Sequence, residues 1–122
     1  MYSIKTTLEI SAAHQLRLNY GSPCSNLHGH NWIITVFCRS DKLDSNGMVL
    51  DFARLKRIVK ERYDHQYLND RLQVNPTAEN IAFDIANTLN HNEELKNETS
   101  FICYRVDVQE TDGNTASWEL NE

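Results

Sequence analysis

A thiol and two imidazoles fall within the seven residues of Cys24–His30, directly ahead of an apolar run. Residues 29–40 contain this run, Trp32–Cys38, which predicts a strand covered on both faces. Side chains two residues apart on a strand point to the same side, so His28 and His30 are expected on one face. The segment therefore predicts a buried strand whose first residues bring two ring nitrogens together.

Two imidazoles on one face can hold a transition metal if a third ligand joins them. His14 offers one, because residues 2–14 alternate apolar and polar side chains and predict a half-buried strand that ends at this histidine. Three histidines leave one zinc position open, as catalytic sites do. Zinc is the expected metal because it suits imidazole ligands and needs no redox partner. The alternative is that His28 and His30 are ordinary polar residues near a strand start.

The remaining elements follow from periodicity and turn signals. Apolar residues at helical spacing predict a helix over 51–63, and Thr77 is expected to cap a second helix that polar residues 90–100 close. Strands are predicted over 101–109 and 116–118, joined by an Asp-Gly-Asn turn. The order ββααββ predicts an α+β fold, with a four-stranded antiparallel sheet and both helices on one face. Association of chains in rings would cover the unpaired sheet edges.

Length and charge narrow the class of protein. The chain has 122 residues, a net charge of −5 and neither repeat nor linker, which indicates one domain over 1–122 and argues against a nucleic-acid partner. It shows no signal peptide and no apolar run near the ~18 residues of a membrane span. An odd count of three cysteines indicates a reduced, cytoplasmic protein. Cys38 and Cys103 fall in apolar strand patterns and are expected in the core.

Other reactive side chains each allow two or more interpretations. Cys24 lies in a polar loop and is a fourth zinc ligand, a core thiol or a catalytic base; the catalytic role is favoured because a nearby cation would promote its thiolate. Asp64–His65 follows a helix end and either transfers protons or merely caps that helix. Glu79 is interpreted as a carboxylate that favours the helix dipole, and Glu110 as an exposed charge at a strand end. The alternative is that a buried carboxylate of this kind accepts two parallel hydrogen bonds from an aminopyrimidine.

Six segments occur in the order of a known family. They are Ser11–His14, Cys24-x-x-x-His28-Gly29-His30-Asn31, Gly47–Lys56, Asp64–Asn69, Asn75–Asn80 and Glu110–Thr111. Through them the chain resembles the 6-pyruvoyltetrahydropterin synthase superfamily, and within it most closely the 6-carboxytetrahydropterin synthase branch of queuosine biosynthesis. Each segment alone is modest, whereas six in register are highly specific.

The resemblance implies a tunnelling fold, in which ββααββ units assemble into a multi-subunit barrel. The assembly is usually a homohexamer, with active sites between subunits. The resemblance also implies three groups of site residues. The zinc ligands are His14, His28 and His30. The catalytic residues are Cys24, Asp64 and His65. The pterin-binding residues are Thr77, Glu79 and Glu110.

By the same resemblance, the substrate is 7,8-dihydroneopterin triphosphate. The implied enzyme is a carbon–carbon lyase that releases acetaldehyde and triphosphate and leaves 6-carboxy-5,6,7,8-tetrahydropterin. The spacing of four residues from Cys24 to His28 resembles the carboxy branch, since pyruvoyl synthases carry a longer spacer. The alternatives are a pyruvoyl synthase, a non-catalytic pterin- or metal-binding protein of this fold, and a structural zinc domain. Gln15 stands where the family often has arginine, so Arg17 becomes a candidate triphosphate contact.

Overall fold

Strands and helices follow one another in the order ββαααββ in the computed structural model, which describes residues 1–121. The strands are β1 (Tyr2–His14), β2 (His28–Ser40), β3 (Ile102–Thr111) and β4 (Asn114–Glu119). The helices are α1 (Phe52–Tyr63), α2 (Ala78–Asn90) and α3 (Glu93–Glu98), and single 3-10 turns form at Pro23–Ser25 and Leu68–Asp70. No helix in the described range is long and apolar enough to cross a membrane.

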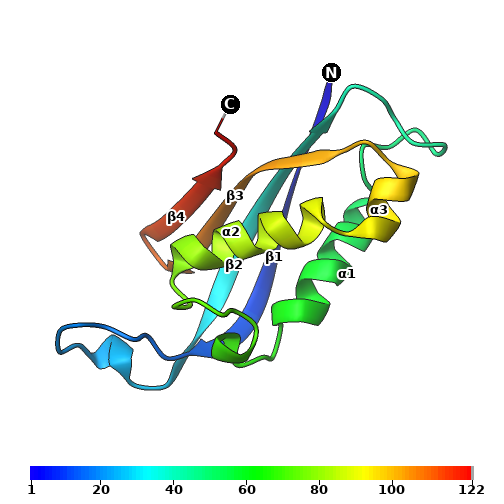
Figure 1. Ribbon diagram of the computed structural model, residues 1–122. Coiled ribbons are helices and arrows are strands. Elements are labelled where there is room, and N and C mark those ends of the chain that lie inside the picture. Colours follow the sequence, from blue (N-terminus) through cyan, green and yellow to red (C-terminus); the bar gives the residue numbers. More distant parts are fainter. Residues whose placement is uncertain (122) are drawn as a thin grey trace.

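The four strands form one antiparallel sheet in the order β1-β2-β3-β4 (Figure 1). Each strand pairs with its neighbour in sequence, and the long connection from β2 to β3 carries all three helices. Gly113 adopts a left-handed φ of 80° in the turn between β3 and β4, as the Asp-Gly-Asn signal predicts. The predicted α+β fold is confirmed, and the barrel of several subunits stays a prediction.

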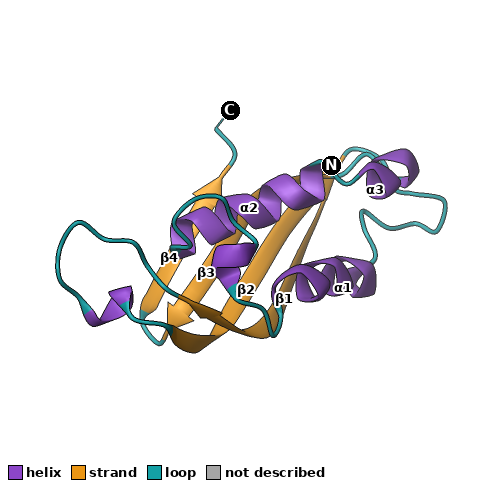
Figure 2. Cartoon of the chain, turned by 60° about the horizontal axis from the view of Figure 1, so that its bottom comes forward, coloured by secondary structure: helices purple, strands orange, loops and turns teal. Residues whose placement is uncertain are grey.

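The helices cover one face of this sheet (Figure 2). Even-numbered residues of β1 and β2 point toward the helices and are mostly buried, whereas odd-numbered residues point away. On that open face, Ile33 and Phe37 stay half-buried within the single chain. The expectation that residues 29–40 are covered on both faces is therefore wrong for one chain. The apolar run therefore predicted the buried helix-side face of β2 correctly but not the partial exposure of its other face.

Both predicted helices begin at side-chain caps. Asp51 accepts a 2.9 Å hydrogen bond from the N–H of Ala53, and Thr77 accepts one of 3.2 Å from the N–H of Asn80. The third helix, α3, lies within residues 90–100, the polar segment that was predicted only to close the second helix. Asn92 caps it, and only Leu95 reaches the core. A helix with a single buried residue leaves no hydrophobic period to detect.

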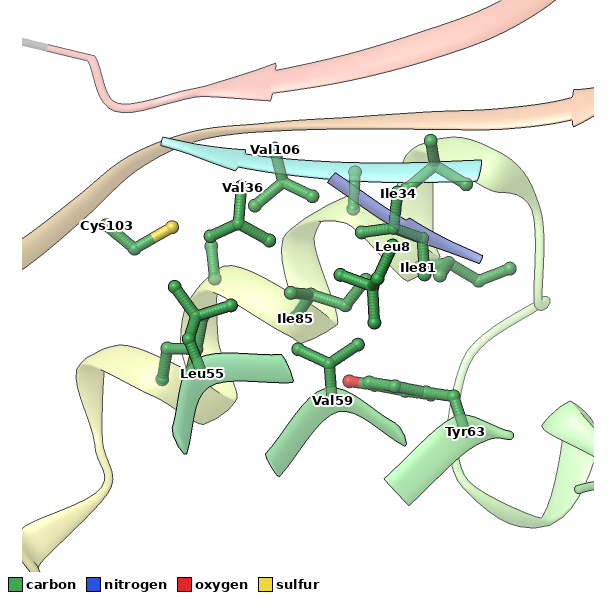
Figure 3. Packing of buried hydrophobic residues seen from close by; sticks show 14 of the residues in the cluster. Leu8, Ile34, Val36, Leu55, Val59, Tyr63, Ile81, Ile85, Cys103 and Val106 are labelled. Carbon is green, nitrogen blue, oxygen red and sulfur yellow. The ribbon is translucent and has the colours of Figure 1, made fainter. Parts of the chain in front are cut away.

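The core fills the space between the sheet and the helices (Figure 3). Leu55 and Val59 of α1 face Ile85 of α2 there, all at most 1% exposed. Burying side chains of this size stabilises the fold by about 1.5–3 kcal/mol each. Cys38 and Cys103 are also fully buried, which confirms their predicted place in the core. The apolar core cluster itself contains no histidine, although His14 is fully buried beside its Trp32.

Candidate metal centre and adjoining pocket

Three histidines meet at one end of the helix-covered face. His14 is the last residue of β1 and pairs with His28, the first residue of β2, while His30 pairs with Ala12. Strand alternation places all three imidazoles on the same side. Their ligand atoms lie within 4.8 Å of one another. The predicted three-histidine cluster therefore exists, and the antiparallel pairing of β1 with β2 creates it.

Two of the rings are oriented by backbone carbonyls. His14 donates its Nδ1–H to the carbonyl of Pro76 at 2.8 Å, and His28 donates its Nδ1–H to Asn26 at 2.7 Å. The Nε2 atoms of these two rings then face each other at 3.0 Å. In neutral rings with this tautomer, both Nε2 atoms carry lone pairs, which repel unless a cation lies between them. Carbonyls that accept from Nδ1 are the usual outer support of metal-bound imidazoles.

His30 completes the cluster with an unpaired nitrogen. Its Nε2 is buried and has no hydrogen-bond partner among residues 1–121. Burial lowers the pKa of His14 and of His30 below the ordinary histidine value and so favours neutral rings. Trp32 packs edge-on against both rings, with centroid distances of 4.9 and 5.2 Å. Neutral imidazoles with convergent free nitrogens fit a divalent transition metal, and zinc suits three such donors.

A pocket of about 370 Å³ adjoins the histidines. Thr77, Glu79 and Glu110, the three residues predicted to bind a pterin, all line it. Glu110 occupies a β-bulge between Gln109 and Thr111, which turns its side chain out of the regular alternation. The sequence interpretation missed the other lining residues. They are Leu16, Ala78, Gly113, Asn114, Thr115 and Ala116.

The Asp-Gly-Asn turn signal could have identified Gly113 and Asn114 as lining residues, because this turn follows shortly after Glu110.

Glu110 also reaches two of the histidines. One carboxylate oxygen lies 3.8 Å from Nε2 of His14 and the other lies 3.7 Å from Nε2 of His30. The pocket and the three-histidine cluster therefore share a wall.

Cys24 lies apart from this cluster. It is half-buried in the 3-10 turn Pro23–Ser25, where its N–H donates to the side chain of Ser22 at 3.2 Å. Its carbonyl accepts a 3.0 Å hydrogen bond from Leu16. In the described chain the thiol is not among the grouped metal-ligand atoms. This placement fits a thiol that acts beside the metal rather than on it.

Two asparagines hold the segment between His14 and this turn. The side-chain amide of Asn69 accepts from the N–H of Gln15 at 2.9 Å and donates to its carbonyl at 2.8 Å. Asn75 makes the same pair of bonds to Arg17, both 2.9 Å long. Leu16, between them, donates to Cys24. The segment that follows His14 is therefore held by backbone hydrogen bonds at Gln15, Leu16 and Arg17.

Asp64 and His65 lie at the free edge of β1. Asp64 follows α1, and its carboxylate lies 3.2 Å from Nδ1 of His65. The N–H of Ser11 donates to Asp64 at 2.8 Å, and the N–H of His65 donates back to the Ser11 carbonyl at 2.7 Å. His65 has a left-handed φ of 58° and a side chain 82% exposed. The predicted carboxylate–imidazole pair thus exists, at the end of a helix.

The pair does not join the three-histidine cluster within one chain. His65 lines a surface hollow of about 570 Å³ with Ser11, Gly29 and Asn31, and of the three histidines His30 alone also borders it. His14 and His28 lie on the opposite face of the sheet. Within residues 1–121, no hydrogen bond or ion pair links His65 to either of them.

Fold and site together define an α+β protein with a three-histidine metal centre beside an acidic pocket. The family model described as 6-pyruvoyl tetrahydropterin synthase matches residues 3–121, and the chain belongs to this family. The match spans both the sheet and the site residues, so it covers every element described above.

Individual relatives agree with this assignment. The chain is 30% identical over 118 residues to a 6-carboxy-5,6,7,8-tetrahydropterin synthase of Bacillus subtilis, covering 90% of this chain and 80% of that protein. It is 42% identical over 91 residues to the enzyme of that name from Synechocystis, covering 67% and 70%. The solved 6-pyruvoyl tetrahydropterin synthase of Caenorhabditis elegans superposes with a TM-score of 0.69 at 27% identity, covering 98% and 96% of the two chains.

Proposed function

We propose that this protein is a zinc-dependent carbon–carbon lyase. It converts 7,8-dihydroneopterin triphosphate to 6-carboxy-5,6,7,8-tetrahydropterin, acetaldehyde and triphosphate, a step of queuosine biosynthesis. The observation that carries the proposal is the convergence of His14, His28 and His30 beside the pocket of Glu110. The names of the relatives from Bacillus subtilis and Synechocystis support the carboxy branch.

Pterin recognition is assigned to the acidic pocket. A carboxylate can accept two parallel hydrogen bonds from the amino group and ring N–H of an aminopyrimidine, a strong planar pairing. Glu110 is the proposed partner of this edge, because its side chain is only 27% exposed and faces the histidines. Thr77 and Glu79, at the start of α2, line the same pocket and complete the polar wall.

Three histidines would hold the zinc ion through their free ring nitrogens. When bound there, zinc supplies Lewis-acid stabilisation to the oxygens of the substrate side chain. The carbonyls of Pro76 and Asn26 keep His14 and His28 in the tautomer that leaves Nε2 available. The rings therefore need no rearrangement of their protons to serve as ligands.

Proton transfer is assigned to Cys24 and His65. The Cys24 thiolate accepts a proton from the substrate side chain, and the His65 ring carries a proton to or from the reacting carbon or oxygen. Asp64, 3.2 Å from Nδ1 of His65, holds the ring orientation and tautomer. The 82% exposure of the His65 side chain within one chain supports an active site between subunits. A homohexamer is the proposed assembly.

Product analysis tests the proposal directly. The zinc-loaded protein is incubated with 7,8-dihydroneopterin triphosphate, and the products are identified by mass spectrometry. We expect 6-carboxytetrahydropterin together with acetaldehyde. A product that keeps the three-carbon side chain would instead identify a pyruvoyl synthase. Binding of the pterin without turnover would identify a non-catalytic member of the fold and refute the proposal.

A further inference from the structure

The carboxylate of Glu110 spans two of the proposed metal ligands. Oε2 lies 3.8 Å from Nε2 of His14, and Oε1 lies 3.7 Å from Nε2 of His30. Both separations are smaller than the 4.8 Å that encloses the ligand atoms of the histidine cluster. Each carboxylate oxygen thus lies near one ring nitrogen, although Glu110 is not itself one of the three grouped ligand residues of the described chain.

These separations do not describe hydrogen bonds. They exceed the 2.7–3.2 Å range of an N–H···O bond. His14 already donates its Nδ1–H to Pro76, so a neutral ring presents a lone pair to the carboxylate. Nε2 of His30 is buried and unpaired in the described chain. An anion opposite two lone pairs is unfavourable in a buried setting, unless a cation lies between them.

A single cation would satisfy all of these groups. Zinc ligand atoms lie about 2.0–2.2 Å from the metal, so neighbouring ligands at a tetrahedral site stand roughly 3.5 Å apart. The separations of 3.8 and 3.7 Å from His14 and His30 are only slightly longer than this, so a movement of the Glu110 side chain would bring one oxygen to such a site. The β-bulge at Glu110 is a local feature that can provide this adjustment.

We propose that Glu110 is the fourth metal ligand of the substrate-free protein and leaves the metal when a pterin binds. This inference rests on the metal centre of the proposed function. Glu110 lines the pterin pocket as well as the cluster, and one carboxylate cannot serve both partners fully at once. Pterin binding draws Glu110 to the aminopyrimidine edge and opens the metal position that the substrate side chain then occupies. The carboxylate thereby couples recognition of the ring to exposure of the metal.

A cobalt-substituted protein tests this directly. Co²⁺ replaces zinc, and azide is titrated as a small anionic probe of an open metal position, monitored by the visible d–d absorption. We expect the substrate-free protein to bind azide weakly and E110Q to bind it at least ten-fold more tightly. E61Q is the matched control, because Glu61 is an exposed residue of α1 that lies outside this pocket. It is expected to behave as the unmodified protein does.

Two further comparisons separate ligation from charge repulsion. E110D keeps the negative charge but withdraws the carboxylate by one methylene, so ligation predicts azide binding close to that of E110Q. Repulsion alone predicts weak azide binding in E110D, and that result would overturn the inference. Addition of 7,8-dihydropterin, which lacks the side chain that would itself occupy the metal position, is expected to raise the azide affinity of the unmodified protein toward the E110Q value. No change on adding this pterin would also overturn it.

The metal content of each variant distinguishes the two proposals. If the unmodified protein binds neither Co²⁺ nor zinc, the metal centre of the proposed function fails. If all variants bind Co²⁺ but show equal azide affinities, the metal centre stands and the role of Glu110 is wrong. Circular dichroism checks that each variant keeps its fold. Zinc competition with a chelator is expected to show a loss of affinity on the order of ten- to hundred-fold for E110Q.

Discussion

The carboxylate of Asp64 accepts a 2.8 Å hydrogen bond from the backbone N–H of Ser11 and so ties the end of α1 to β1. This bond, the largest cause, holds the pKa of Asp64 below its ordinary value of 3.8. A depressed carboxylate pKa stabilises the folded state above the unfolded pKa, and the contribution is lost as the pH falls through the folded pKa. Acid is therefore expected to weaken this link selectively.

Asp64→Asn keeps an oxygen for Ser11 but removes the charge. We expect it to lower the free energy of unfolding by about 1 kcal/mol at pH 7, the difference between a charged and a neutral acceptor at a partly exposed site. Urea unfolding at pH 7 and at pH 3 measures the difference from the unmodified protein. The difference should shrink at pH 3, where the carboxyl of the unfolded chain is protonated. An equal difference at both pH values would show that the charge is irrelevant.

Loss of one histidine is expected to abolish metal binding without unfolding the chain. His28 is half-buried, so His28→Ala should change the stability of the metal-free protein by less than about 1 kcal/mol. Zinc affinity should fall by more than about 100-fold, because only two ring nitrogens remain. Metal analysis after dialysis against a weak chelator tests this. His91→Ala is the control, since His91 is an exposed residue at the end of α2.

Chelation of zinc should remove activity while the fold persists. The apolar core cluster contains no histidine, so a bound metal is expected to act mainly as a ligand of the folded state. Binding at 100 times the dissociation constant contributes about 2.7 kcal/mol. We expect the melting midpoint to fall by roughly 10 °C on chelation, with the circular dichroism at 25 °C unchanged. Global unfolding at 25 °C would point instead to a structural zinc domain.

Replacement of the thiol separates catalysis from ligation. Cys24→Ala is expected to keep the zinc content and the fold but to lower turnover by at least about 100-fold, the usual contribution of a general base. Ser25→Ala, in the same turn, is the control and should retain turnover. A drop in zinc content together with the thiol would make Cys24 a metal ligand.

The asparagine contacts predict an effect at a distance from the metal. Asn75→Ala removes two hydrogen bonds to the backbone of Arg17 and should lower the free energy of unfolding by about 1–3 kcal/mol. The loop carrying Cys24 should then loosen, so turnover should fall while zinc content stays constant. Asn97→Ala, exposed on α3, is the control. Unchanged turnover in Asn75→Ala would show that the thiol loop is positioned by other contacts.

The sequence predicted the features that follow from the periodicity of side chains within one helix or strand. Strand alternation placed His28 and His30 on one face, and helical spacing identified α1 and α2. It could not predict that β1 pairs with β2 in the register that brings His14 opposite His28, because register depends on the whole sheet. The exact contacts of Glu110 were equally hidden, since they depend on a bulge that no residue pattern marks.

Asn69 and Asn75 contact only main-chain atoms of Gln15 and Arg17. The side chains of Gln15 and Arg17 can therefore change without affecting the asparagine hydrogen bonds that hold their backbone in place. The Gln15 side chain donates to the carbonyl of Ser25 at 2.9 Å and accepts from the hydroxyl of Tyr67 at 3.5 Å, so its own contacts are separate from those that hold its backbone. A substitution at position 15 or 17 would therefore change the charge presented next to His14 while the asparagine contacts that fix this part of the backbone stay the same.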